Sequence, residues 1–171
     1  MRELQLLAVA TFFALIVGGG LFLLVSGGLS DIGSTYRPQF KTVASSVSGP
    51  TDVLTSRKNY VFREQEDFVA FWELIYGNDP AATRPPVIAF ARDHAIAVVA
   101  GVKNTGGYEI YVRDVIETPE ERIVEVVMRS PGEGCQVTEA FTNPFQIISV
   151  KKTDKPLRAV EIKEEYSCGV Q

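Results

Sequence analysis

The feature that most constrains this chain is an uncharged, strongly apolar run close to its N-terminus. No charged side chain occurs from Leu6 to Val25. As a helix this run would rise about 30 Å, which matches the hydrocarbon core of a bilayer. A helix satisfies its own backbone hydrogen bonds and can therefore cross that layer. We expect residues 1–26 to form an N-terminal transmembrane anchor or uncleaved signal, with a cleaved secretory signal as the alternative.

The remainder of the chain is expected outside the cytoplasm. Few basic residues flank the apolar run, so the positive-inside rule decides little here. The cysteines, Cys135 and Cys168, suit an exported domain, in which they can form a disulfide that closes a loop of about 34 residues. The expected location is the cell membrane, with a single pass and the C-terminal domain outside. Secretion after signal cleavage and two unbonded thiols are the alternatives.

Residues 27–52 are expected to be a flexible linker. They are rich in Gly, Ser and Thr and include the stretch Ala44–Pro50, which has no apolar period. Such composition is typical of flexible coil. The alternative is a loosely ordered first strand around Phe40 to Val43.

The third part of the chain, residues 53–171, has the pattern of a β-rich domain with one helix. Helical spacing relates Phe68, Phe71, Trp72, Ile75 and Tyr76. Alternation of apolar and polar residues favours an antiparallel sheet. The predicted fold class is α+β, a mostly antiparallel β-sheet or open barrel with one packed α-helix. The expected strands are Asn59–Arg63, Val87–Phe90, Ala95–Ala100, Tyr108–Val115, Arg122–Met128, Phe145–Val150 and Arg158–Tyr166.

The sharpest local signal is a glycine-rich turn between two apolar runs. Its residues are Asn104, Thr105, Gly106, Gly107 and Tyr108. Paired glycines permit positive φ and close backbone approach, so this turn is expected to close a β-hairpin. It is either a structural turn or a rigid loop that presents Asn104, Thr105 and backbone amides to a partner.

The residues available for catalysis are few. His94 is the only histidine, and no nucleophile signature accompanies it. The pairs Glu120–Glu121 and Glu164–Glu165 are interpreted as solvated charges, with a carboxylate hydrolase as a weaker alternative. No phosphate loop or dinucleotide fingerprint occurs, and the net charge of -4 argues against nucleic acid as a partner. We expect no enzyme activity, no cofactor and no metal.

Three segments carry a resemblance to a known family. They are Gly101–Val112 with its Thr-Gly-Gly-Tyr block, the Ser130-Pro131-Gly132 turn, and Thr142–Ile148 with its Thr-Asn-Pro-Phe start. Together they resemble the C-terminal domain of the protease-complex subunit PrcB family, over roughly Arg57 to Val160. This chain departs from the family in having Ala89 where similar sequences often carry an acidic residue.

The resemblance implies an exported, non-catalytic protein that binds and stabilises a protease. We therefore expect a membrane-tethered extracytoplasmic protein-binding module whose partner is an exported protease or another envelope protein. The alternative is an envelope structural or glycan-binding domain that uses exposed aromatic residues.

Overall fold

The computed structural model describes residues 35–77 and 84–168. These belong to one compact unit that begins at Thr35. The predicted membrane anchor, residues 1–26, lies outside the described residues. Within the described part of the chain, no helix has the length and apolar character that crossing a bilayer requires.

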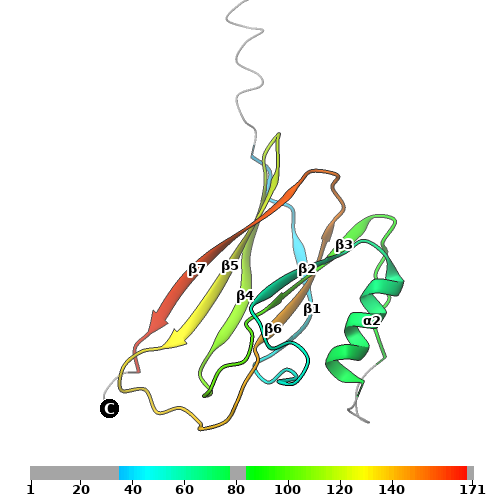
Figure 1. The fold of residues 1–171 in the computed structure, drawn as a ribbon. Coiled ribbons are helices and arrows are strands. Elements are labelled where there is room, and N and C mark those ends of the chain that lie inside the picture. The colour runs from blue at the N-terminus through cyan, green and yellow to red at the C-terminus, as the bar shows by residue number, and fades with distance from the viewer. Residues whose placement is uncertain (1–34, 78–83, 169–171) are drawn as a thin grey trace, which may run out of the picture. The chain divides into compact units, whose positions relative to one another are not determined.

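The described residues form two β-sheets and one helix (Figure 1). The larger sheet is antiparallel and has the strand order β1-β6-β3-β2, and the smaller sheet has the order β4-β5-β7. The strands are β1 (Phe40–Ser46), β2 (Lys58–Phe62), β3 (Asp93–Val99), β4 (Glu109–Glu117), β5 (Arg122–Pro131), β6 (Phe145–Lys151) and β7 (Leu157–Tyr166). The helix is α2 (Gln65–Tyr76).

Helix α2 packs against one face of the larger sheet. Its spacing of apolar residues places Phe68, Phe71 and Trp72 on one side, and all three are buried. The ring of Phe71 lies 4.7 Å from that of Tyr60 on β2, measured between centroids. The predicted helix and its buried face are confirmed.

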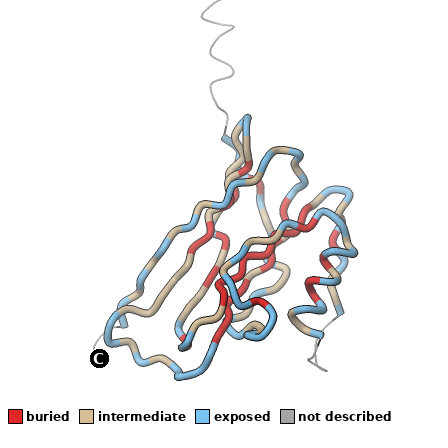
Figure 2. Tube along the Cα trace, viewed as in Figure 1, coloured by how far each residue is buried: buried red, intermediate tan, exposed pale blue. Residues whose placement is uncertain are grey.

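The larger sheet is the middle of three layers, between α2 and the smaller sheet. Its inner strand β3 is buried on both faces. Successive side chains of a strand point to opposite faces. Ala95 and Ala97 therefore pack under the helix, whereas Ile96 and Val98 pack against the smaller sheet. Figure 2 shows this buried centre of the fold, with β7 and the loops more exposed. For the described residues, the predicted β-rich and mostly antiparallel fold with a single helix is confirmed.

One strand pair departs from the antiparallel pattern, because β7 lies parallel to β5. The short spacing of the strands excludes a helical crossover between them. It does not exclude a crossover through β6, which belongs to the other sheet and links β5 to β7 in the chain. The predicted strand Val87–Phe90 is wrong: this segment forms no strand, and the Ala89 carbonyl accepts the N–H groups of Arg92 and Asp93 in a turn.

Part of the predicted flexible linker is strand β1. Its partner is β6, from Phe40 opposite Val150 to Ser46 opposite Phe145. The flexible-linker prediction is therefore wrong for Phe40–Ser46, and the alternative of a first strand is what the structure contains. The polar side chains of β1 suit an edge strand, which faces solvent along one side, whereas Phe40, Val43 and Ala44 pack partly buried against the core.

Strands β1 and β4 are edge strands of different sheets, and the line between them is termed the seam. Tyr36 and Glu117 exchange backbone hydrogen bonds of 2.9 and 2.7 Å, which close one end of the seam. At its other end, Ser45–Val47 and Glu109–Tyr111 line a groove of about 390 Å³. These are called the closed end and the open end.

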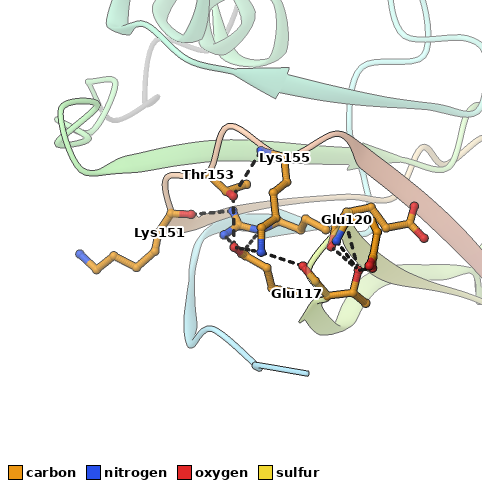
Figure 3. A network of polar contacts seen from close by, with 8 residues as sticks. Glu117, Glu120, Lys151, Thr153 and Lys155 are labelled. Carbon is orange, nitrogen blue, oxygen red and sulfur yellow. Dashed lines mark hydrogen bonds and ion pairs between the residues drawn. The ribbon is translucent and has the colours of Figure 1, made fainter. Parts of the chain in front are cut away.

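A buried ion-pair network supports the closed end (Figure 3). The Arg122 side chain is only 2% exposed, and its Nε donates to Glu117 Oε2 at 3.0 Å. Glu117 also accepts from Thr153 Oγ1 at 3.2 Å and lies 3.3 Å from Lys155 Nζ. Burial alone would raise the pKa of Glu117, but these donors lower it below its usual value.

Candidate functional site

The glycine-rich turn connects two sheets and does not close a hairpin. Strand β3, before it, pairs with β2 and β6, whereas β4, after it, pairs with β5. The hairpin prediction is wrong because turn residues report local backbone shape and not the pairing of the flanking strands. The turn instead carries the chain across from one layer to the next.

An antiparallel loop segment around Thr142 holds the turn in place through its backbone. Lys103 and Thr142 exchange backbone hydrogen bonds of 2.8 and 3.0 Å. The Thr142 hydroxyl donates to the Thr105 carbonyl at 2.8 Å, and the Gly106 N–H donates to the Thr138 carbonyl at 2.9 Å. The turn is thus fixed at successive residues, which lowers the entropy it would lose on binding a partner.

Gly107 is required both by its conformation and by its surroundings. Its φ is +85°, a region that side chains other than glycine seldom adopt. A Cβ atom there would lie 2.9 Å from Val137 Cγ1 and 3.0 Å from the Tyr166 hydroxyl. The Gly107 carbonyl accepts a hydrogen bond from that hydroxyl at 3.1 Å. The end of β7 therefore contacts the turn directly.

The disulfide ties the loop after β5 to the end of β7. Cys135 and Cys168 are bonded, with their Cα atoms 5.1 Å apart, and the predicted disulfide is confirmed. Beside it, the Gly132 N–H donates to the Tyr166 carbonyl at 2.9 Å. Through Tyr166, the crosslink, the loop and the turn form one connected structure.

Four residues form the exposed face of this structure, which we term the turn surface: Asn104, Thr105, Gly107 and Phe141. Asn104 and Gly107 are exposed, Thr105 is half-buried, and the Phe141 side chain is 68% exposed. Of the other predicted binding residues, Gly106 is buried and Tyr108 is half-buried, with the Lys103 ammonium 5.6 Å from its ring centroid. Partner binding by the predicted residues Asn104–Tyr108 stays a prediction.

Sequence reasoning did not single out two residues of this region, although Phe141 was among the aromatic residues considered for an interface. Phe141 has no periodic neighbours, so no pattern distinguishes it from a core aromatic residue. Asn143 is fully buried, and its amide donates to the Pro50 and Leu54 carbonyls at 2.6 and 2.8 Å. An Asn-Pro pair directly before a strand was the only available signal. It indicates a turn, not a buried side chain that hydrogen-bonds with a distant loop.

The residues considered for catalysis lie apart from the turn surface. His94 is buried on β3 beside the closed end, where burial and then the charges of Arg63, Lys152 and Arg122 lower its pKa. Glu121 pairs with Arg158, and Glu164 with Arg113. In residues 35–77 and 84–168, no group of three or more His, Cys, Asp or Glu side chains is placed to hold a metal ion.

Comparison with known proteins gives one match. The family model described as PrcB C-terminal matches residues 95–151. The matched segment runs from β3 to the end of β6 and includes the turn and Cys135, whereas α2, β7 and Cys168 lie outside it. The resemblance to the PrcB family is confirmed over this segment. No curated protein and no solved structure matched significantly.

Proposed function

We propose that this chain is a non-catalytic protein-binding module, tethered to a membrane on its outer side, and that its partner is an exported protease. The observation that carries the proposal is the turn surface, a rigid and partly apolar face inside the segment that matches PrcB C-terminal. The resemblance to the protease-complex subunit PrcB family supplies the class of partner.

The physical case for binding is that the turn surface is already ordered. Backbone hydrogen bonds fix the turn, and the disulfide fixes the loop that carries Val137 and Thr138. An exposed Phe141 beside polar Asn104 has the composition of a small interface centre, where an aromatic residue is surrounded by polar groups. A preformed face of this kind binds with less loss of entropy than a mobile loop.

A role without catalysis fits the environment of His94. A general base needs access to substrate and a pKa near the working pH. His94 is 5% exposed, and burial lowers its pKa, which disfavours the protonated form that a general acid requires. Its position on the central strand β3 suits a structural role.

The proposed location draws on two features. The apolar run from Leu6 to Val25 has the length of a membrane-spanning helix. The disulfide between Cys135 and Cys168 is of the kind that persists in oxidising compartments outside the cytoplasm. Tethering would raise the effective concentration near a membrane-associated protease, so a modest affinity would suffice.

A glycan-binding role receives less support. Stacking on sugars needs aromatic rings gathered on one face. Among the described residues, the most exposed aromatic side chains are Tyr36 and Phe141. Tyr36 pairs with Glu117 at the closed end, whereas Phe141 adjoins the turn at the other end of the domain.

The test is capture of envelope proteins by the full chain. Phe141→Ala and the double change Asn104→Ala with Thr105→Ala are expected to reduce recovery of an exported protease about tenfold or more, as is typical for the centre of an interface. Matched controls are Val87→Ala, an exposed apolar side chain, and Gln39→Ala, an exposed amide distant from the turn. Equal recovery by all variants, or no protease recovered by the wild type, would refute the proposal.

A further inference from the structure

The open end of the seam exposes the backbone of two strand edges to one groove. Each edge strand of a sheet has a row of N–H and C=O groups without ladder partners. β1 is the edge of the larger sheet and β4 the edge of the smaller one. The antiparallel pairing of Tyr36 with Glu117 brings the two edges together at the closed end, and the groove separates them at the other.

On β4, the protein satisfies the edge N–H groups except at the groove. Residues two apart in a strand direct their N–H groups to the same edge. Ile110 therefore directs its N–H like Val112, away from β5, and no described residue accepts it. The satisfied donors on this edge are Val112 to Gln146 Oε1 at 2.7 Å, Val115 to Asp114 Oδ1 at 2.8 Å and Glu117 to the Tyr36 carbonyl at 2.7 Å.

On β1, Ser45 has the corresponding position. The Ala100 N–H donates to the Pro144 carbonyl, so the even-numbered residues of β6 hydrogen-bond with β3 and the odd-numbered ones with β1. Ser46 lies opposite Phe145 and joins the ladder. The backbone N–H and C=O of Ser45 thus point away from β6, toward the groove.

The groove has the dimensions and charge of a site for an extended peptide. Ser45–Val47 and Glu109–Tyr111 form its walls, and Pro144–Gln146 form its floor. The single formal charge in this lining is Glu109, whose carboxylate lies 3.4 Å from Arg129 Nη1. An uncharged segment is therefore the complementary occupant.

The edge of β7 makes an informative contrast. β7 is longer than β1 and also unpaired on its outer side, but it exposes Glu161, Lys163 and Glu165. Charged side chains on an edge strand oppose pairing with another chain. The open end of the seam lacks this protection, whereas the Tyr36–Glu117 pair closes the other end.

We propose that the open end of the seam binds an extended, uncharged peptide segment of the partner protein, which adds as a strand along β4 at Ile110 and also hydrogen-bonds with the outward backbone of Ser45 on β1. Strand addition supplies affinity through main-chain hydrogen bonds and selectivity through the adjacent side chains. The groove lining on β4 begins at Glu109, two residues after Gly107 of the turn surface. The assignment of this peptide segment to the partner protein rests on the proposed function.

The experiment selects ligands for the full chain, held in mild detergent, from a phage-displayed library of random peptides. Synthetic copies of the selected peptides are expected to be uncharged and to protect the Ile110 amide from hydrogen exchange. Ser45→Pro removes one outward N–H without breaking the ladder to β6, a position where proline is tolerated. It should weaken peptide binding about threefold to tenfold, the effect of one hydrogen bond.

The matched control is Val61→Pro, an outward position on the β2 edge, which should bind peptide like the wild type. Exchange at Ile110 in the wild type needs no variant, so it decides the matter even if Ser45→Pro fails to fold. Protection of another edge, no enriched peptide, or protection of Ile110 by self-association of the chain would each overturn the proposal. Protease capture that is lost in Phe141→Ala but unaffected by Ser45→Pro would overturn it while the proposed function stood.

Discussion

The two ends of the domain differ in how they use polar groups. At the closed end, Glu117 joins Tyr36 through its backbone and Arg122 through its side chain, and Lys155 and Thr153 complete the set. At the open end, the turn is held by a disulfide and by glycine contacts, and the Ile110 N–H has no acceptor among the described residues.

The difference separates stability from binding. A buried ionic group is stable only when it is fully paired, and at the closed end the backbone groups that Tyr36 and Glu117 direct at each other are also paired. A covalent crosslink and close backbone packing can hold a loop without using up its polar groups. The open end is therefore rigid and still has hydrogen-bonding capacity, as a recognition surface requires.

The largest expected effect comes from removing the central cation of the closed end. Arg122→Met leaves the Glu117 carboxylate and the Lys151 carbonyl without their buried donor. We expect the free energy of unfolding to fall by about 3 kcal/mol or more, measured by urea denaturation. Combining it with Glu117→Leu should restore part of the loss, and an unchanged midpoint in the single variant would contradict the comparison.

The second effect tests the crosslink of the open end. Replacing both Cys135 and Cys168 by serine should cost about 3 to 4 kcal/mol, because a loop with a sequence separation of 33 becomes unconstrained in the unfolded chain. Reducing the wild type should lower its thermal midpoint equally, and the double variant should not respond to reductant. A loss below about 1 kcal/mol would mean that the loop is held by its other contacts.

The third effect separates close packing from backbone strain. Gly107→Ala should cost about 1 to 3 kcal/mol, since a positive φ and contacts with Val137 and Tyr166 both oppose the added Cβ. Gly134→Ala is the control, because Gly134 has φ +81° but no atom within 4 Å of the added Cβ. Equal losses in thermal denaturation of the two variants would show that the turn does not depend on contact with β7.

The smallest effect is an acid dependence of the closed end. The lowered pKa of Glu117 means that the folded state favours its ionised form. This contribution to stability is present above the ordinary glutamate pKa of about 4.3 and is lost as the pH falls through that value toward the folded-state pKa. Glu117→Gln should flatten the dependence of the urea midpoint in that range. His94, whose pKa is also lowered, contributes an earlier loss below about pH 6.5, which this variant should keep.

Much of the fold followed from local patterns. Helical spacing placed α2, because Phe68, Phe71 and Trp72 must share one face to be buried together. Alternation placed β4 and β5, each of which buries one face against the larger sheet. The disulfide followed from the cysteine content and the expected export.

Strand β1 followed only as an alternative, because its apolar residues have no clear period, although Phe40, Val43 and Ala44 pack partly buried against the core. The same limit applies to the site. The residues of the glycine turn were visible in the sequence, but their attachment to Thr138, Thr142 and Tyr166 was not.

The sequence by itself determined which segments bury a face, where the chain turns and which cysteines could bond. The tertiary structure alone decided that β3 and β4 join different sheets, that β7 runs parallel to β5, and that one seam is closed by Glu117 and open at Ile110. The physical reason is the sequence distance over which each property is set. Burial periodicity and turn conformation depend on residues that are neighbours in the chain. The pairing of edges depends on backbone groups that are chemically alike at every position, and only the packing of distant segments assigns their partners.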